Sequence, residues 1–419
     1  MKILIVNQWF WPDSPPQASM LRSIGRHLVA EGHEVTVLTA QPAMNTSTAQ
    51  KRMPWREKLD GLLVLRYRLL PIGFNAGLMM RTVNMFIFMF AVIRHVVFRP
   101  RVDSYDVILV STMPPVLLAA TVRLVASLTG ASFLYHIMDI YPEAAVINNR
   151  IREGLLAHWL RKIDRETCSH AIRVVALSDD MRDTIAGRGS SISNVRIINN
   201  FQLESFGVQG HLPDSMRKPE GSFRLLFAGN VGKSQGLDAV IMAFSRLDDL
   251  PNLRLDILGD GAARKNLELQ AGEKLGTRIF FHGYQPTENA SQMIATADLS
   301  LVTLRPELYR IAYPSKTMSY LAAGTPILAI VEEKSALASM VRTEGVGYIS
   351  PHGDVSSIAS KIRQAYEDKE SIQEMRIKAL NLAAREFTPE AVLPKWAKIF
   401  KKISEQRALS RKSQFESNP

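Results

Sequence analysis

The chain has 419 residues, of which 46% are hydrophobic and 22% charged, as expected of a globular protein with room for two domains. Cys168 is the only cysteine, so a disulfide framework within one chain is excluded and a thiolate metal site is not expected. Residues 1–200 hold 23 Lys and Arg against 15 Asp and Glu, a difference of +8 within the total of +11, so an anionic partner is expected.

Strands and helices alternate through the first half of the chain. Apolar runs predict strands at 2–7, 34–39, 62–68, 105–111, 132–136, 171–177 and 194–198. Helical patterns lie between them, near 18–30, 78–98, 115–129, 151–169 and 179–187. This alternation predicts an α/β domain over residues 1–205, doubly wound around a mostly parallel sheet.

The helix expected near 78–98 carries bulky Met and Phe residues edged by cations. Its longest apolar run, 83–93, is too short to span a bilayer as a helix, which needs about 20 residues. A helix bordered by Arg81 and Arg94 is typical of an anchor on a membrane surface, although a core helix covering a sheet gives the same pattern. No secretory signal follows Met1, and no basic run has interleaved aromatic residues. We therefore expect a cytoplasmic protein, peripheral on the inner face of the cell membrane, that binds no nucleic acid.

A second alternation follows a break in the pattern. Residues 206–221 contain three glycines and two prolines without apolar periodicity, which indicates an interdomain linker. Strands are then expected at 223–229, 253–259, 278–282, 298–303 and 326–330, and helices at 235–247, 261–274, 287–296 and 314–323. They predict a second doubly wound domain over 222–388, with closing helices near 355–367, 371–386 and 389–405. We expect 389–419 to return to the first domain and its polar tail, 406–419, to fray.

Ligands of doubly wound sheets bind beyond the carboxyl ends of the strands, and with two such domains the natural site is the cleft between them. The stretch from Pro314 to Gly324 has a proline suited to a helix start and a glycine suited to its end. Free backbone N–H groups, the Lys316 ammonium and a hydroxyl from Ser315 or Thr317 would then face an anionic group such as a diphosphate.

Two more loops of the second domain place glycines after strands, where the backbone can approach a phosphate closely. Each loop alone could be an ordinary turn between a strand and a helix. Because all of them are expected at one edge of the sheet, together they predict a nucleotide diphosphate site. Its expected members are Gly229, Asn230, Lys233, Gln235, Gly236, Gly259, Asp260, Glu307, Ser315 and Lys316, to which the family resemblance given below adds Ser319.

The first domain offers groups of a different kind at its strand ends. His136 and Asp139 follow the strand at 132–136, where they could act on an acceptor or be structural. The aromatic residues of loop 7–13 could stack on a sugar, contact a lipid or simply pack. We expect His136, Asp139 and Lys316 to be catalytic, and an acceptor site that contains Trp9, Trp11, Asp13 and Asn200.

Five stretches carry a resemblance that runs along nearly the whole chain: 32–39, 136–139, 229–237, 259–261 and 314–324. They resemble the retaining glycosyltransferases of family 4, which have the two-domain GT-B fold. Within that family the chain is similar to the bacterial surface-polysaccharide branch, which includes colanic acid and O-antigen sugar transferases.

The resemblance implies a nucleotide-sugar donor in the second domain, expected to be a UDP-sugar. It implies a lipid-linked or saccharide acceptor in the first domain and transfer of a hexosyl or N-acetylhexosaminyl group. It also implies retention of the anomeric configuration without a metal ion or other cofactor.

The chain departs from the family pattern where many members carry two glutamates eight residues apart. Ile311 and Ser319 occupy those places, and Glu307 is the carboxylate nearby that could substitute. Two alternatives therefore stay open: another GT-B enzyme, such as a nucleotide-sugar epimerase, and a catalytically degenerate protein that only binds a nucleotide sugar.

A second departure affects the cations that hold the diphosphate. Asn230 and Gln235 stand where members of the family often carry Arg and Lys. Lys233 and Lys316 would then supply the positive charge.

Overall fold

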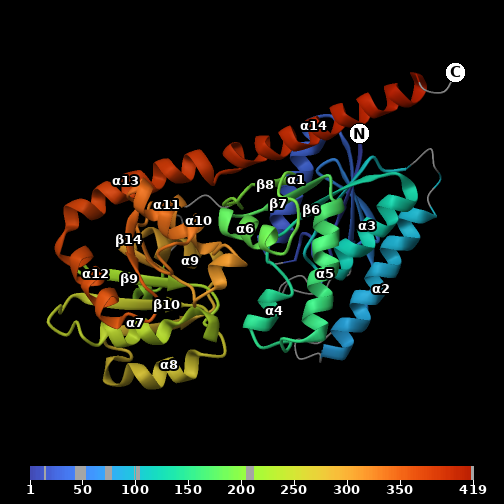
Figure 1. The fold of residues 1–419 in the computed structure, drawn as a ribbon. Helices are drawn as coiled ribbons and strands as arrows, with labels where there is room; N and C mark the ends of the chain where they lie inside the picture. Colours follow the sequence, from blue (N-terminus) through green and yellow to red (C-terminus); the bar gives the residue numbers. More distant parts are fainter. Residues whose placement is uncertain are drawn as a thin grey trace. The chain divides into compact units, whose positions relative to one another are not determined.

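The structure, a computed structural model, describes residues 1–13, 16–42, 53–70, 78–98, 100, 104–203 and 212–416 (Figure 1). The chain divides into two compact units. Unit 1 comprises Met1–Asn199 and Pro389–Pro419, and unit 2 comprises Asn200–Thr388. Part of the linker expected at 206–221, residues 206–211, lies outside the described residues.

Unit 1 is built on an eight-stranded sheet with the order β3-β4-β2-β1-β5-β6-β7-β8. All its pairs are parallel except β3 with β4. The strands are β1 (Lys2–Val6), β2 (Glu34–Ala40), β3 (Arg56–Leu59), β4 (Leu62–Tyr67), β5 (Val107–Ser111), β6 (Ser132–His136), β7 (Arg173–Ala176) and β8 (Val195–Ile197). The chain order reverses between β1 and β5, so the loops after these two strands flank the switch point of the sheet.

The helices of unit 1 are α1 (Pro16–Ala30), α2 (Leu78–Val97), α3 (Leu117–Thr129), α4 (Glu143–Ile147), α5 (Leu155–His170), α6 (Asp179–Gly187) and α14 (Pro389–Glu416). The long α14 packs against α1 (Figure 1). Trp396, Phe400 and Ile403 recur at helical spacing along α14 and are buried. The fraying expected from residue 406 onward is wrong, because the helix continues to Glu416.

Unit 2 has a six-stranded, wholly parallel sheet with the order β11-β10-β9-β12-β13-β14. Its strands are β9 (Phe223–Ala228), β10 (Leu253–Leu258), β11 (Ile279–Gly283), β12 (Leu299–Thr303), β13 (Ile327–Ile330) and β14 (Gly347–Ser350). Its helices are α7 (Leu237–Phe244), α8 (Arg264–Ala271), α9 (Thr287–Ala295), α10 (Lys316–Ala322), α11 (Ala336–Glu344), α12 (Val355–Glu367) and α13 (Lys369–Glu386).

The switch point of unit 2 lies between β9 and β12. These strands pair only through Leu225 with Leu299 and Leu226 with Ser300, although both continue further. Beyond that point the Tyr320 hydroxyl of α10 accepts from the Ala228 N–H (2.8 Å) and donates to its carbonyl (3.3 Å). The Tyr320 side chain therefore takes the place of hydrogen bonds between β9 and β12 where these strands separate. It also holds α10 at the carboxyl end of β9.

Two doubly wound units with parallel sheets confirm the expected fold class. The sequence analysis overlooked short elements, namely β3, β14, α4 and α11. Helix α2 has the length expected near 78–98, and over Met79–Val97 it is long and apolar enough to cross a membrane, by length and composition only. The expectation from the apolar run 83–93 alone, that this helix is too short to span a bilayer, is wrong by that criterion.

Candidate functional site

The carboxyl edge of the unit 2 sheet brings two glycine loops into backbone contact. Gly229 and Gly259 have φ of +142° and +114°, a region that favours glycine. A Cβ on Gly259 would lie 1.9 Å from the Gly229 carbonyl oxygen, and one on Gly261 would lie 2.5 Å from the Val231 carbonyl oxygen. The Val231 N–H donates to the Asp260 carbonyl at 2.9 Å. The loops after β9 and β10 are thus packed main chain against main chain, which side chains at these glycines would prevent.

Lys316 reaches the same place from α10. Its Nζ donates to Gln235 Oε1 at 2.7 Å and lies 3.8 Å from the centroid of the Phe227 ring. A Cβ built on Gly229 would be 3.6 Å from this Nζ. Burial lowers the pKa of Lys316 to about 7. The structure therefore brings together Gly229, Gln235 and Lys316, while Gly259 and Asp260 flank them through the β10 loop.

The helix of this stretch begins later than the sequence analysis expected, at Lys316 rather than Pro314. The N–H groups of Thr317 and Met318 donate to the carbonyls of Pro314 and Ser315, at 3.0 and 3.2 Å. The Thr317 side chain is buried. The N–H groups of Thr317 and Met318 are therefore already bonded, and of the two hydroxyl groups in this turn that of Ser315 is exposed while that of Thr317 is not.

The remaining members of the expected donor site lie apart from Lys316 or make other bonds. Glu307 has a φ of +66°, pairs with Arg310 at 2.8 Å, and its N–H donates to Glu332 Oε2 at 2.7 Å. The Ser319 hydroxyl donates to Gln202 Oε1 at 2.8 Å. Three others are exposed at the same sheet edge: Asn230, Lys233 and Ser315.

Gly236 has a φ of +64° and packs under an imidazole that the sequence analysis missed. A Cβ on Gly236 would be 2.2 Å from Cε1 of His352, which follows β14. Burial lowers the pKa of His352. The sequence could have indicated His352 as a site residue, because a strand recognised at 347–350 would have put His352 at its carboxyl end.

In unit 1 the two expected catalytic groups have different surroundings. His136 ends β6, and its ring is buried edge-on against Trp396 of α14, with centroids 4.9 Å apart. Neither ring nitrogen has a hydrogen-bond partner among the described residues, and burial lowers the pKa of His136 to about 3. Asp139 is partly exposed, and burial raises its pKa to about 6. At neutral pH the imidazole is therefore uncharged, and Asp139 can exchange a proton near pH 6.

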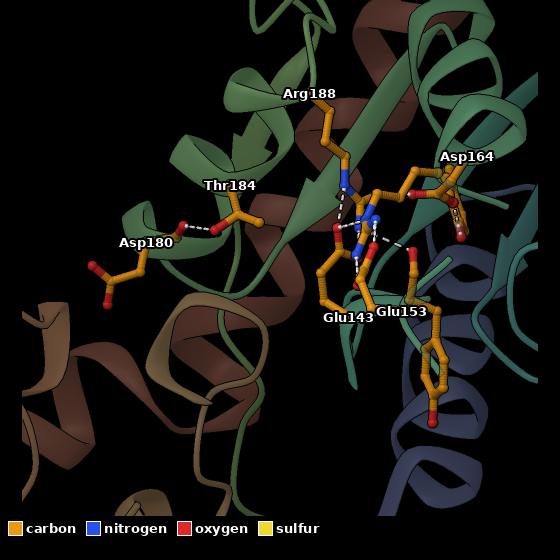
Figure 2. A network of polar contacts seen from close by, with 9 residues as sticks. Glu143, Glu153, Asp164, Asp180, Thr184 and Arg188 are labelled. Atoms are coloured by element: carbon orange, nitrogen blue, oxygen red, sulfur yellow. Dashed lines mark hydrogen bonds and ion pairs between the residues drawn. The ribbon is translucent and has the colours of Figure 1, made fainter. Parts of the chain in front are cut away.

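The loop that carries Asp139 is fixed by an ion-pair network (Figure 2). Arg188 pairs with Glu143, donates to Asp164 Oδ2 at 2.5 Å, and donates to the Tyr141 carbonyl at 3.0 Å. Arg161 pairs with Glu143 (3.1 Å) as well. Figure 2 shows Arg188 pointing between Glu143 and Asp164, so α4 and α5 are joined through one guanidinium.

The expected acceptor residues divide between the two units. In the loop after β1, the Arg22 guanidinium lies 4.4 Å from the centroid of the Trp11 ring, and the Trp9 carbonyl accepts from Asn7 at 2.6 Å. Asp13 is buried. Asn200 is also buried, and it is the first residue of unit 2, although the first domain was expected to extend over 1–205. The loop with Trp9 and Trp11 lies at the switch point of the unit 1 sheet, and His136 lies at the end of the strand next to β5.

Among the described residues, no group of three or more His, Cys, Asp or Glu side chains is arranged to hold a metal ion.

Comparison with known sequences identifies both halves of the chain. Residues 17–200 match the family described as glycosyl transferase 4-like domain, and residues 209–381 match glycosyl transferases group 1. The two matches follow one another along most of the chain. The chain therefore belongs to the glycosyltransferases, and its two parallel-sheet domains are those of the GT-B fold.

Individual glycosyltransferases are similar to this chain in sequence or in structure. A putative colanic acid biosynthesis glycosyl transferase, WcaI of Escherichia coli, is 24% identical over 87% of this chain and 92% of its own length. The probable glycosyltransferase WbjE of Pseudomonas aeruginosa is 27% identical over 62% of this chain and 66% of its own length. Among solved structures, HepE of Anabaena in complex with UDP-glucose has a TM-score of 0.69 at 15% identity, and the match covers 96% of this chain and all of that one.

Proposed function

We propose that this protein transfers a sugar from a nucleotide diphosphate sugar, expected to be a UDP-sugar, to a lipid-linked or saccharide acceptor of a bacterial surface polysaccharide. The observation that carries the proposal is the position of the Lys316 ammonium beside Gly229 at the switch point of unit 2. Support comes from WcaI, whose description names colanic acid biosynthesis, and from HepE, which was solved with UDP-glucose. The acceptor would bind at the carboxyl edge of unit 1.

The chemistry needs placement and charge more than a strong base. As the bond between the anomeric carbon and the phosphate oxygen breaks, negative charge grows on the leaving diphosphate, which Lys316 would stabilise. The acceptor oxygen forms the new bond to the anomeric carbon, and its proton passes to the leaving phosphate. Asp139 would orient the acceptor hydroxyl. On the resemblance alone, we also propose that transfer retains the anomeric configuration and needs no metal ion.

Thermal unfolding with UDP-, GDP- and ADP-sugars tests the donor site, because a ligand at 100 times its Kd adds about 2.7 kcal/mol of stability. We expect a UDP-sugar to raise the melting temperature of the native protein and not that of Lys316→Met. Transfer to lipid-linked acceptors should fall about 10²–10³-fold in Lys316→Met. Lys265→Met, on α8, is the matched control and should behave as the native protein.

Three results would reject parts of this proposal. Normal transfer by Lys316→Met would remove the assigned role of the lysine. Donor binding without transfer to any acceptor would favour the degenerate binding protein, and release of an epimerised sugar would favour the epimerase.

We also propose that unit 1 binds the anionic surface of the cytoplasmic membrane. Helix α3 packs between α2 and α5 (Figure 1). Their exposed side chains include large apolar groups, and α2 and α3 contain no acidic residue. The exposed apolar residues of this three-helix face are Met79, Val83, Phe86, Phe90, Leu124, Leu128, Leu155, Leu156 and Trp159.

Two exposed cations continue the helical spacing of these apolar residues: Arg94 is four positions after Phe90, and Lys162 is three positions after Trp159. Arg81, also exposed, lies in the first turn of α2, and cations beside an apolar surface suit anionic headgroups. Sedimentation with vesicles of anionic or zwitterionic lipid tests this part of the proposal. We expect binding to anionic vesicles that weakens in salt and falls at least about 100-fold in Leu155→Ser/Trp159→Ser, since each large side chain contributes about 1.5–3 kcal/mol when fully buried. Leu269→Ser, an exposed apolar residue of unit 2, is the control, and equal loss in both variants would contradict the assigned face.

A further inference from the structure

The Lys316 ammonium lies among neutral groups. Gln235 Oε1 is 2.7 Å from Nζ, and the centroid of the Phe227 ring is 3.8 Å away. Phe227 is fully buried in β9, and Gln235 ends the short 3₁₀ turn Lys233–Gln235. Tyr320, one helical turn after Lys316, fixes α10 to Ala228. Two side chains and the anchored helix therefore define where Nζ lies.

The carboxylates around this edge bond elsewhere. Asp260 pairs with Arg264 at 3.4 Å, Glu307 pairs with Arg310, and Glu332 accepts from the Glu307 N–H. Among the described residues, no ion pair includes Lys316. The charged and titratable groups of the surrounding elements include Lys233 on the 3₁₀ turn, Asp238 on α7, Asp260 after β10, Glu288 on α9, Arg305 and Glu307 after β12, Tyr320 on α10 itself, Glu332 after β13, His352 after β14 and Arg376 on α13.

We propose that Phe227 and Gln235 are positioning residues that hold Lys316 without a protein counter-ion, so that the donor diphosphate supplies the counter-charge and its binding brings a proton onto Nζ. This inference rests on the proposed function. The proton comes from solvent, and no covalent bond of the donor changes in the step. An aromatic face and an amide oxygen both favour an ammonium over a neutral amine, but neither neutralises its charge.

The pKa of Lys316, near 7 without ligand, gives the expected direction of the pH dependence. An adjacent diphosphate raises that pKa, so the bound state holds more protons than the free state above pH 7. Affinity for the diphosphate should therefore be highest below about pH 7 and fall by up to about tenfold per pH unit above it.

Calorimetric titration of the full-length protein with UDP tests the inference. Buffers of different ionisation enthalpy report the protons taken up at each pH. We expect about 0.5–0.9 proton per UDP near pH 8 in the native protein. Lys316→Arg keeps the charge but remains protonated, so uptake and the steep pH dependence should both disappear. Because His352 is present in both proteins, the difference between them isolates Lys316.

The positioning residues have their own variants. Gln235→Glu supplies a carboxylate in place of the amide, so proton uptake should approach zero and UDP affinity should fall at least about tenfold. Phe227→Leu keeps the apolar volume but removes the ring, and should weaken UDP binding about two- to fivefold. A purely structural role for Gln235 would leave proton uptake unchanged.

The failures of the two proposals are distinguishable. UDP binding without proton uptake in the native protein, or with full uptake in Lys316→Arg, overturns this inference and leaves the proposed function standing. Absence of binding by UDP, GDP and ADP overturns the proposed function, and this inference with it.

Discussion

The loops at the carboxyl edges of the two sheets are held in place by different kinds of contact. In unit 1 the loop after β6 is held by side chains, with Arg188 joining Glu143, Asp164 and the Tyr141 carbonyl. In unit 2 the loops after β9 and β10 are held by backbone, with Gly259 against the Gly229 carbonyl. An edge fixed by side chains can present an acid such as Asp139, whereas an edge of close-packed main chain leaves room beside a cation for an extended anion.

The difference also appears in the charges. The network of unit 1 balances its guanidinium groups with carboxylates inside the protein. Lys316 in unit 2 has no such partner among the described residues. A site that binds an anion gains affinity when its cation has no partner within the protein. A site that orients a neutral hydroxyl gains precision when its loop is rigid. Variants can test each half of this comparison.

The largest effect is expected from Arg188→Met in unit 1. The variant leaves Asp164, whose side chain is 3% exposed, without its cation, which typically costs about 3–5 kcal/mol. Urea unfolding followed by tryptophan fluorescence measures unit 1 selectively, because all five tryptophans (Trp9, Trp11, Trp55, Trp159 and Trp396) belong to it.

Arg161→Met is the matched control for Arg188→Met. The Arg161 side chain is 27% exposed and its partner Glu153 is 59% exposed, so about 1 kcal/mol or less is expected. Equal losses in the two variants would show that the network does not depend on the buried pair.

The second effect concerns the backbone contact of unit 2. In Gly259→Ala the new methyl group would overlap the Gly229 carbonyl at a positive φ, and roughly 2–4 kcal/mol of unit 2 stability should be lost. Gly353→Ala is the control, because Gly353 also has a positive φ (+80°) but has nothing within 4 Å of the built Cβ; about 1 kcal/mol is expected. Unfolding followed by circular dichroism, with the fluorescence transition of unit 1 as reference, measures both. A Gly259→Ala protein that still binds UDP normally would contradict the need for this close approach.

The fold was predictable because its signals are local. Long apolar strands and capped helices can be recognised from the sequence alone. They predicted the fold class and the sheet edges at which the loops lie. Three of the missed elements are short: β3 and β14 have four residues each and α4 has five. At that length, periodicity cannot separate a strand or helix from a loop. Length does not explain the fourth, α11, which has nine residues, as many as the predicted helices α6 and α9.

The site was predictable only in part, because its surroundings come from distant segments. Lys316 was found from the motif around it, but its contact with Phe227 depends on the separation of β9 from β12. His136 was expected to be available to an acceptor, yet Trp396, which is 260 positions away, covers its ring. Burial of this kind arises from tertiary packing and has no sequence signal at the residue itself.

The smallest effect comes from Asp139, and its sign separates a functional acid from a structural one. Its pKa is about 6 in the folded protein against an ordinary value of 3.8, so between these pH values the folded chain binds more protons than the unfolded chain. Stability of unit 1 should therefore fall as pH rises from about 4 to 6. Because the side chain is partly exposed, the loss is about 1–2 kcal/mol rather than the full value of the shift.

Asp139→Asn removes this penalty, so the variant should be about 1–2 kcal/mol more stable than the native protein at pH 7.5 and equally stable below about pH 4. His136 has the opposite dependence, since a ring kept neutral by burial loses stability as pH falls from 6.5 toward 3, but that dependence is common to both proteins and cancels in their difference. Asp183→Asn, at an exposed carboxylate on α6, is the control and should give no gain. A gain of stability together with reduced transfer would mean that an acid costly to the fold is kept for the reaction. A less stable Asp139→Asn at pH 7.5 would show instead that Asp139 supports the loop.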